Sequence, residues 1–445
     1  MKLTILGGGG FRVPMVYTAL LANETIKIDE LWLYDIDEDR LARISAVLSG
    51  LSAQQQRWLD VRCTTVLDEA VRDADFVFCA IRVGHLEGRI IDERVPLAEG
   101  VVGQETTGPG GICFALRTVP VMVELAETVA RLAPKAWFVN FTNPAGLVTE
   151  AIYEILSGRV VGICDSPAAL CRRVARALDR DPAELRFDYF GLNHLGWLRG
   201  VYDQTGDLLP GLLADDERLA TFEEGRLFGG DWLRSLAMIP NEYLYFYYFS
   251  SDTVGAVKSN LQSRAEFLFD QQRRFYAGNG DGPAAALDMW YETRSEREAS
   301  YFREARTAAK LEDRLQEPES IGYEGEALAV VEAIAGNRGE MLILNTANAS
   351  SLPFLDAKAI VEVPCVVGGW GIVPTSVGEV PGHARALIET IKDVERTTIR
   401  AALSGSSELA IQALAMHPLV PSVSVARRIF AGYSASQPQL AHVLR

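Results

Sequence analysis

The sequence predicts an α/β protein whose first half forms a parallel, doubly wound sheet. Three observations support this class: apolar strand-like segments alternate with helical ones, the first strand runs into four consecutive glycines, and the second ends in an aspartate. Such alternation is typical of strand–helix–strand units with parallel strands. We expect strands at residues 2–6, 31–35, 61–65, 75–81, 136–141 and 160–164, and helices at 15–23, 38–51, 115–133 and 150–156.

The glycine run at residues 7–10 indicates a dinucleotide-binding turn. Glycines between a strand and a helix let a pyrophosphate approach the backbone amides at the helix N-terminus. Asp35 lies about where such units place a carboxylate for the adenosine ribose, and its charge would repel a 2′-phosphate. Val13 replaces the third glycine of the pattern, and a glycine run alone also fits an ordinary tight turn. In the alternating context we expect a Rossmann domain that binds NAD.

Polar residues follow several of the expected strands. Open parallel sheets bind their ligands at the carboxyl ends of the strands. The residues at these ends are Arg82, Asn140, Asn143, Cys164 and Asp165. Loop and helix-cap chemistry would also explain them, with helix starts at 143–144 and 166–167. Cys164 precedes such a helix, whose N-terminus would stabilise a thiolate, so it is a candidate metal ligand or nucleophile as well as a candidate buried structural thiol.

Beyond residue 178 the alternation loosens, and we expect two domains, residues 1–165 and 166–445, the second also α/β. An apolar strand at 187–192 leads to His194 in a Gly/Asn-rich turn, which suits a metal ligand or a hydrogen-bonded turn histidine. Helices are expected at 261–276, 325–334 and 382–403. The tyrosine-rich stretch IPNEYLYFYYF would pack in a core or interface, or supply a base if a cation lowered the pKa of a tyrosine.

Composition excludes several function classes. The net charge of −16, with no basic patch, argues against nucleic-acid binding. No apolar run reaches the roughly 18 residues of a membrane span, and the start lacks the pattern of a signal peptide. The six cysteines show no paired spacing, which indicates reduced thiols and a cytoplasmic location.

Several stretches together resemble glycoside hydrolase family 4. They are GGGGFRVP, IRVGHLEGRIIDERVPLAEGVVGQETTGPGG, NFTNPAG, GICDSP, GLNHLGW, NEYLYFYY, VEVP and AMHPLVP. The resemblance runs from Lys2 to about Pro421. It implies a Rossmann domain of the lactate/malate dehydrogenase type followed by an α/β substrate domain. It also implies an enzyme that uses NAD and a divalent metal, usually manganese, to hydrolyse glycosides, commonly 6-phosphoglycosides.

The resemblance implies a route outside the usual two-carboxylate mechanism. NAD takes a hydride from sugar carbon 3, a base removes the proton on carbon 2, and the aglycone leaves by elimination. Water then adds, and the same NADH returns the hydride. A metal would act as a Lewis acid on the developing ketone.

The resemblance also suggests roles for individual residues. Cys164 and His194 match the metal ligands, although a thiolate is an unusual partner for manganese. Tyr243 matches the base, and Asn143 should bind sugar hydroxyls. Arg89 and Arg264 are candidates for the sugar phosphate because arginine forks suit phosphate, although ordinary ion-paired arginines would also fit. We expect the cofactor to contact Gly8, Gly9, Gly10, Phe11, Arg12, Asp35, Arg82 and Asn140.

Asp165 leaves the anomer preference open. Aspartate after the metal cysteine is typical of 6-phospho-α-glucosidases, where it protonates the leaving group, whereas NEYL and HPLVP are more like the β-type members. We expect a 6-phospho-β-glucosidase acting on a phosphorylated disaccharide or aryl glucoside, with the α-type as alternative. A plain NAD-dependent dehydrogenase and a non-catalytic NAD-binding regulator are the alternatives of other classes. The resemblance also implies a homodimer or homotetramer.

Overall fold

A single mixed sheet organises the molecule. The computed structural model describes residues 1–259, 262–278, 282–311 and 322–443. Within these residues the strands form one 13-stranded sheet in the order β10-β8-β7-β12-β11-β6-β5-β4-β1-β2-β3, with β13 beside β12 and β9 beside β8. The order 3-2-1-4-5-6 at one end is that of a doubly wound dinucleotide-binding sheet, as predicted.

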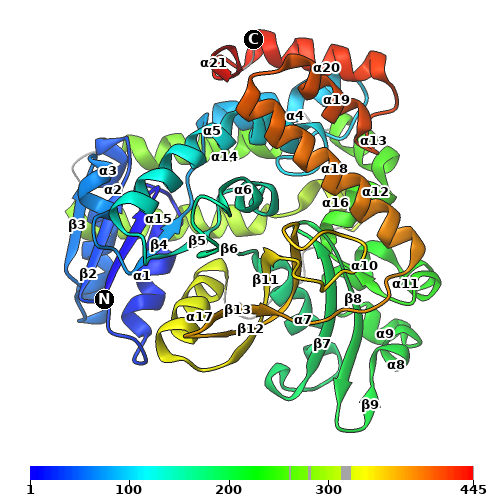
Figure 1. Cartoon of the computed structure of the whole chain (residues 1–445), viewed down its shortest axis with the longest axis horizontal. Coiled ribbons are helices and arrows are strands. Elements are labelled where there is room, and N and C mark those ends of the chain that lie inside the picture. Colours follow the sequence, from blue (N-terminus) through cyan, green and yellow to red (C-terminus); the bar gives the residue numbers. More distant parts are fainter. Residues whose placement is uncertain (260–261, 279–281, 312–321, 444–445) are drawn as a thin grey trace.

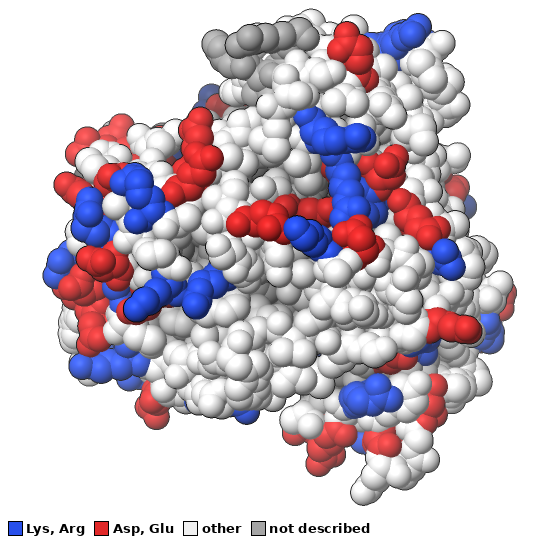
Figure 2. Space-filling model, viewed as in Figure 1, with Lys and Arg blue, Asp and Glu red and all other residues white. Residues whose placement is uncertain are grey.

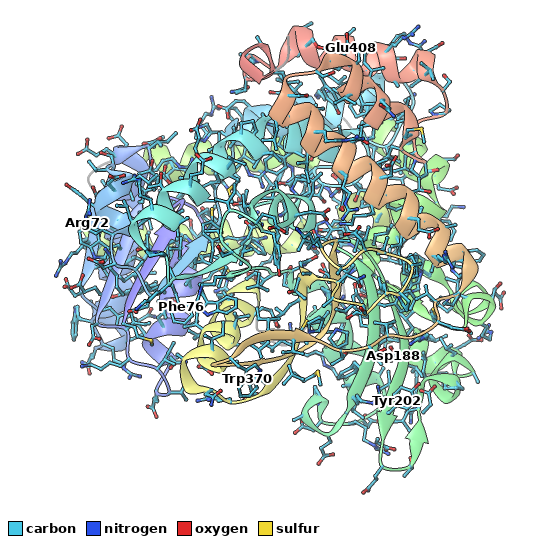
Figure 3. The ribbon with its side chains drawn as sticks, viewed as in Figure 1. Arg72, Phe76, Asp188, Tyr202, Trp370 and Glu408 are labelled. Atoms are coloured by element: carbon cyan, nitrogen blue, oxygen red, sulfur yellow. The ribbon has the colours of Figure 1, made fainter. Side chains whose placement is uncertain are left out.

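The first six strands are parallel and carry the predicted Rossmann arrangement. They are β1 (Lys2–Leu6), β2 (Glu30–Tyr34), β3 (Val61–Thr64), β4 (Phe76–Cys79), β5 (Trp137–Asn140) and β6 (Val160–Gly162). β1 and β4 are buried along nearly their whole length, because helices cover both faces of a parallel sheet. Figure 3 labels Phe76, the first residue of β4.

The helices of the first half differ from the sequence prediction in several places. They are α1 (Val13–Ala22), α2 (Glu38–Gln55), α3 (Leu67–Val71), α4 (His85–Ala98), α5 (Pro109–Leu132), α6 (Ala145–Ile152) and α7 (Asp165–Ala177). α4 was not predicted, and α5 begins before the predicted residue 115. A Cβ on Gly110 would lie 2.0 Å from the carbonyl oxygen of Gln104, so the glycines let the preceding loop lie against the first turn of α5.

After β5 the predicted helix start at 143–144 is confirmed, because Pro144 is the N-cap residue of α6, but the predicted helical range and the cap predicted after β6 were misplaced. α6 covers 145–152 rather than 150–156. α7 begins at Asp165 with Cys164 as its N-cap residue, so Ser166 is not the cap. Cys164 therefore lies at the junction of strand and helix itself.

The second half extends the same sheet with antiparallel strands. They are β7 (Arg186–Leu192), β8 (Leu195–Asp203), β9 (Gly206–Asp207), β10 (Ile239–Pro240), β11 (Glu340–Ala347), β12 (Ile360–Gly368) and β13 (Gly371–Pro374). β11 joins β6 through the pair Asn345–Gly162. Figure 3 labels Asp188 and Tyr202 on the neighbouring strands β7 and β8, and Trp370 at the β12–β13 turn. The predicted boundary at residue 165 coincides with the start of α7, and the division into two domains stays a prediction because the sheet continues across it.

Helices of the second half surround the end of the sheet and the carboxyl edge of its parallel strands. They are η1 (Pro182–Glu184), α8 (Leu209–Leu213), α9 (Asp216–Leu219), α10 (Glu223–Phe228), α11 (Gly230–Leu236), η2 (Glu242–Leu244), α12 (Tyr245–Tyr248), α13 (Ser250–Ser259), α14 (Arg264–Ala277), α15 (Gly282–Ala299), α16 (Arg303–Ala308), α17 (Tyr323–Gly336), α18 (Gly382–Ser404), α19 (Ser407–Met416), α20 (Val423–Ser436) and α21 (Leu440–Val443). Three match the predicted helices, although residue 261 lies outside the described residues.

Figure 1 shows α18–α21 along the top and right of the molecule, away from the N-terminus. Acidic and basic side chains are interleaved over the face that α18 crosses (Figure 2), where Lys392 and Arg396 pair with Glu150 of α6. Among the described residues, no helix is both long enough and apolar enough to cross a bilayer.

Candidate active site

A cavity of about 550 Å³ lies at the carboxyl edge of the parallel strands. Its walls come from the glycine turn after β1, the loops after β4, β5 and β6, the β7–β8 turn and α14–α16. This is a common size for a small-molecule site, and the edge is where doubly wound sheets bind ligands. The following predicted residues line it: Gly10, Phe11, Arg12, Asp35, Arg82, Arg89, Asn143, Cys164, Asp165, His194, Tyr243 and Arg264.

The glycine turn is used largely for packing. Gly7 has φ +87°, and a Cβ there would lie 2.9 Å from the carbonyl oxygen of Ala80, so the position requires glycine. The amide of Gly8 donates to the carbonyl of Tyr34 and that of Gly10 to Gly7. A Cβ on Gly8 would meet Leu33 of β2 at 2.7 Å. The cofactor contacts expected of Gly8 and Gly10 stay predictions: their amides are engaged within the protein, and Gly10 lines the cavity.

Asp35 holds the turn in place from the end of β2. Its carboxylate accepts hydrogen bonds from the amides of Gly9 at 2.9 Å and Asp37 at 3.2 Å. The amide of Gly9 is therefore also engaged within the protein, and the cofactor contact expected of Gly9 stays a prediction. Asp35 still lines the cavity where a ribose would reach it. Phe11 and Arg12 follow at the start of α1; the Phe11 ring is buried against Phe275, with centroids 5.2 Å apart.

Asn140 does not reach the cavity. Its amide group donates to the carbonyls of Thr142 and Ala145 and to the Thr149 hydroxyl, and its oxygen accepts from the Thr142 amide. Asn140 is fully buried. The predicted cofactor contact is therefore wrong: this residue folds the NFTNPAG loop, which presents Asn143 to the cavity instead.

His194 is held at the β7–β8 turn by its backbone and by Thr106. It has φ +59°, an uncommon value for a residue other than glycine. Its Nδ1 lies 2.7 Å from the hydroxyl oxygen of Thr106, and its ring stacks on Tyr243 with centroids 3.7 Å apart. Burial lowers the pKa of His194 to about 3, so the ring is neutral at physiological pH.

We assign the proton of the neutral His194 ring to Nδ1 from the hydrogen bonds around Thr106. The Thr106 hydroxyl donates to Gln104 Oε1 at 3.1 Å, so its oxygen is left to accept from His194 Nδ1–H. A neutral imidazole protonated at Nδ1 has its lone pair on Nε2. This is the arrangement that a metal-binding histidine with a supporting partner uses.

Cys164 lines the same cavity and is buried. Burial raises the pKa of its thiol well above the ordinary value, and the charges of Glu362 and Asp165 raise it further. Hydrogen bonds from Ser166 at the start of α7 lower it, but by less. The predicted effect of the helix N-terminus is therefore present, but burial and the two carboxylates outweigh it. A bound cation would be needed to favour the thiolate.

The ring of Tyr243 lies against the ring of His194 in the cavity. The Tyr243 hydroxyl lies 3.5 Å from that of Tyr301, and its ring packs on Phe302. Burial raises the pKa of Tyr243 well above 10, and the neighbouring Tyr301 and Cys164 raise it further. The sequence prediction required a cation beside this tyrosine to lower its pKa. The main effects of the described residues on the pKa of Tyr243 come from burial and from neutral or acidic groups, not from a cation.

Arg82 and Arg89 are joined by one carboxylate. Arg82 Nη2 pairs with Glu105, and Arg89 Nη1 lies 2.7 Å from the other oxygen of the same group. Arg89 also pairs with Glu93 at 2.7 Å. The two arginines hold the pKa of Glu105 well below its usual range, although burial opposes them. Much of the Arg89 charge is therefore neutralised within the protein.

Arg264 begins α14 on the opposite wall. Its guanidinium donates to the Ser300 hydroxyl and, at 3.1 Å, to the carbonyl of Arg297. Burial and the nearby Arg89 lower the pKa of Arg264 to about 10. Arg264 makes no carboxylate pair with any described residue, which leaves its charge available for an anion.

The sequence prediction missed Thr106, Arg297 and Tyr301, all of which line the cavity. Thr106 lies within the GQETTGPGG stretch already singled out, so its position was a usable signal. Arg297 and Tyr301 come from α15 and the turn after it, where the sequence offers no motif.

The residues that line the cavity fit both cofactors that the sequence predicts, a divalent metal and NAD. His194 and Cys164 both line the cavity and would supply a nitrogen and a sulfur donor. The described residues include no group of three or more histidine, cysteine and acidic side chains suited to a metal, so substrate or water would complete the coordination. For NAD, Asp35 and Arg12 flank the turn, and the buried Arg82 Nη1 has no hydrogen-bond partner in the described part of the chain.

Comparison with protein-family models matches nearly the whole chain. A family 4 glycosyl hydrolase model matches residues 2–180, and the model of the family's C-terminal domain matches residues 189–420. A probable 6-phospho-beta-glucosidase from Bacillus subtilis is 32% identical over 441 residues, covering 96% of this chain and 94% of its own. A maltose-6′-phosphate glucosidase from the same organism is 32% identical over 452 residues, with the same coverages.

Solved structures of similar proteins include both anomer types. A 6-phospho-beta-glucosidase from Thermotoga maritima, determined with manganese, NAD+ and glucose-6-phosphate, has a TM-score of 0.82 at 27% identity and full coverage of both chains. A 6-phospho-alpha-glucosidase from gut microorganisms, in complex with NAD and Mn²⁺, has a TM-score of 0.80 at 27% identity over 98% of both chains. A lactate dehydrogenase from Eimeria maxima, at 14% identity, covers 91% of this chain and 97% of its own with a TM-score of 0.54 and shares the fold.

Proposed function

This chain belongs to glycosyl hydrolase family 4, and from that premise we propose that it hydrolyses 6-phospho-β-glucosides with the help of NAD and a divalent metal, for which manganese is our candidate. One observation carries the proposal. Cys164, His194, Tyr243 and Arg264 come from four separate elements, yet they line one cavity together with the glycine turn. A dinucleotide, a metal and a phosphorylated sugar can therefore meet there.

The donor set supports the assignment of cofactors. Cys164 and His194 would hold the metal, while Asp35, Arg12 and Arg82 would bind NAD. When bound, these groups supply a hydride acceptor for sugar carbon 3 and a Lewis acid for the oxygen on it. Arg264, with Arg89 behind it, would bind the 6-phosphate and fix the sugar's position.

Two residues of the chain would handle protons. Tyr243 lies beside His194 and would take the proton from carbon 2. Its raised pKa means that the phenol needs the positive charge of a loaded site before it can act as a base. Asp165, the first residue of α7, lines the cavity next to Cys164 and would bind the leaving oxygen or a sugar hydroxyl, as Asn143 would from the neighbouring loop after β5.

The anomer preference rests on the NEYL and HPLVP stretches, which are of the β type, while Asp165 supports a 6-phospho-α-glucosidase as the second candidate. Paired assays with α- and β-nitrophenyl glucoside 6-phosphates, in the presence of NAD, manganese and a reductant, distinguish them. We expect cleavage of the β-anomer. Cleavage of the α-anomer alone would reverse the assignment, and no cleavage of either would contradict the assignment of 6-phosphoglucosides as substrates.

Asp165→Asn tests the role of that residue on both anomers. If Asp165 protonates the leaving group of an α-glucoside, the variant loses α-cleavage. If it only binds hydroxyls, β-cleavage falls modestly and in step with substrate affinity.

Cofactor stoichiometry separates the glycosidase from a dehydrogenase. The glycosidase releases no net NADH, because the same cofactor molecule accepts and returns the hydride. A dehydrogenase would release NADH in proportion to product. Absorbance at the NADH band during turnover measures the difference directly, and a non-catalytic regulator would tolerate Tyr243→Phe without loss of function.

We also propose a cytoplasmic location and a homodimer or homotetramer. All six cysteines are free thiols, which supports a reducing compartment. The oligomeric state can be measured by sedimentation of the NAD-loaded protein. A purely monomeric protein would contradict the proposal.

A further inference from the structure

Arg297, near the end of α15, lines the cavity with an unpaired charge. Its guanidinium makes no hydrogen bond or ion pair with any residue in the described part of the chain. Its Cζ lies over the ring of Phe11, 6.0 Å from the ring centroid. Arg89 differs, because its guanidinium forms ion pairs with Glu93 and Glu105.

Four other arginines lie near Arg297, and the carboxylate of Glu105, which pairs with two of them, is the acidic group that also interacts with Arg297. Burial lowers the pKa of Arg297 well below its ordinary value, and four other arginines lower it further. They are Arg12, Arg264, Arg89 and Arg82. A partly buried cation among like charges is unfavourable unless an anion neutralises it.

The position of Arg297 is fixed by contacts between the second half and the glycine turn. Trp290, two turns earlier on α15, donates from Nε1 to the carbonyl of Phe11 at 2.9 Å. Tyr276 of α14 donates to the carbonyl of Gly9 at 2.8 Å. The carbonyl of Arg297 accepts from Arg264 at 3.1 Å. Arg297 therefore lies between the glycine turn and the candidate sugar-phosphate residue.

We propose that Arg297 binds a phosphate group of a ligand in this cavity, either the pyrophosphate of the dinucleotide or the 6-phosphate of the sugar. The first source stands independently of the proposed function, whereas the second rests on it. Guanidinium forks match phosphate oxygens geometrically, and a phosphate would neutralise the charge that the cavity leaves unpaired.

The glycine turn explains why an arginine from the second half would be needed. Hydrogen bonds within the protein engage the amides of Gly8, Gly9 and Gly10, so these three donors are not free for a pyrophosphate. A cation supplied by α15 would replace part of that missing stabilisation.

Binding measurements on Arg297→Gln test the proposal without relying on turnover. Isothermal titration would measure the affinity for NAD, and separately the affinity for glucose 6-phosphate with NAD and manganese present. We expect at least one affinity to fall by about tenfold or more, as for loss of a charge-assisted hydrogen bond. Arg294→Gln is the matched control: it lies one turn earlier on the same helix, is paired with Glu298 at 2.7 Å, and should change neither affinity.

Each outcome has a distinct meaning. Loss of NAD affinity identifies the pyrophosphate, loss of glucose 6-phosphate affinity alone identifies the sugar phosphate, and wild-type affinity for both overturns the proposal. Arg297→Gln should leave the melting temperature of the ligand-free protein unchanged or higher, because repulsion among the arginines is relieved. A lower melting temperature would show a structural role and also overturn it. If the wild type cleaves neither glucoside 6-phosphate while Arg297→Gln loses NAD affinity, the proposed function fails and the assignment of Arg297 stands.

Discussion

Replacing Thr106 with valine should weaken metal binding at His194 without disturbing the fold. The valine keeps the size and branching of threonine but cannot accept the hydrogen bond from His194 Nδ1, which is 2.7 Å long. His194 is 8% exposed, so water cannot readily replace the lost partner. The loop itself should survive, because Gln104 Oε1 still accepts from the amides of residues 106 and 107.

The size of the effect follows from the unpaired donor. Leaving a buried N–H without an acceptor costs about 1–3 kcal/mol. Loss of the partner of a metal-binding histidine weakens metal affinity by about 10- to 100-fold. The ring remains stacked on Tyr243, so its plane is still held and only the preference for the Nδ1–H tautomer is lost. We therefore expect the lower half of that range.

Titration of the metal-free protein with Mn²⁺ measures this change. Thr107→Val is the control in the same loop, because the buried Thr107 hydroxyl has no hydrogen-bond partner among the described residues. Thr107→Val should change the Mn²⁺ affinity by no more than about twofold. Equal affinities for Thr106→Val and Thr107→Val would refute both the proposed tautomer and the metal-binding role of His194.

Two further predictions concern the buried charges that hold the helices around the sheet. The Glu150 carboxylate of α6 accepts hydrogen bonds from Lys392 at 2.7 Å and from Arg396 at 2.5 Å. Burial raises the pKa of Glu150, but the two cations lower it by more, so the net shift of this pKa is downward. Its contribution to stability is therefore present above the unfolded-state pKa of about 4.3 and is lost as the pH falls through the lower folded-state pKa. Glu150→Gln should lower the free energy of unfolding at pH 7 by about 2–4 kcal/mol and flatten its decline at acid pH in urea titrations; an unchanged acid slope would contradict this. Arg117 is fully buried and paired with Asp92, so Arg117→Met alone should lower the free energy of unfolding by about 3–5 kcal/mol. The double variant Arg117→Met with Asp92→Leu should recover most of this loss, because it leaves no unpaired buried charge. Equal destabilisation of the single and double variants in denaturant unfolding would contradict the pairing.

Local patterns were sufficient for the parallel half of the fold. Strands β1 to β6 followed from short apolar segments bounded by glycine or polar residues, because burial on both faces requires such segments. Helix starts were less predictable. The starts of α5 and α6 depend on glycines 110 and 146 packing against the Gln104 carbonyl and Asn193, contacts with segments outside each helix.

Sequence motifs also located many of the polar cavity residues to which a role is assigned, but not their chemical state. Cys164, His194 and Tyr243 were identified from three stretches, and all three line the cavity. The helix N-terminus beside Cys164 suggested a stabilised thiolate, yet burial near Glu362 has the larger effect. The burial of Cys164 and the charges near it depend on residues far apart in the chain, such as Glu362. A local sequence motif therefore does not predict the pKa of the thiol.

The sequence by itself determined the class of the protein, the dinucleotide turn and the short stretches that carry the reactive side chains, because these depend on residues close together in the chain. The tertiary structure decided which groups act together. Thr106 orients His194 from 88 positions away, Asn140 turns into its own loop, and Arg297 reaches the glycine turn from a helix of the second half. These pairings arise only when the antiparallel strands and α14–α15 close against the edge of the parallel sheet.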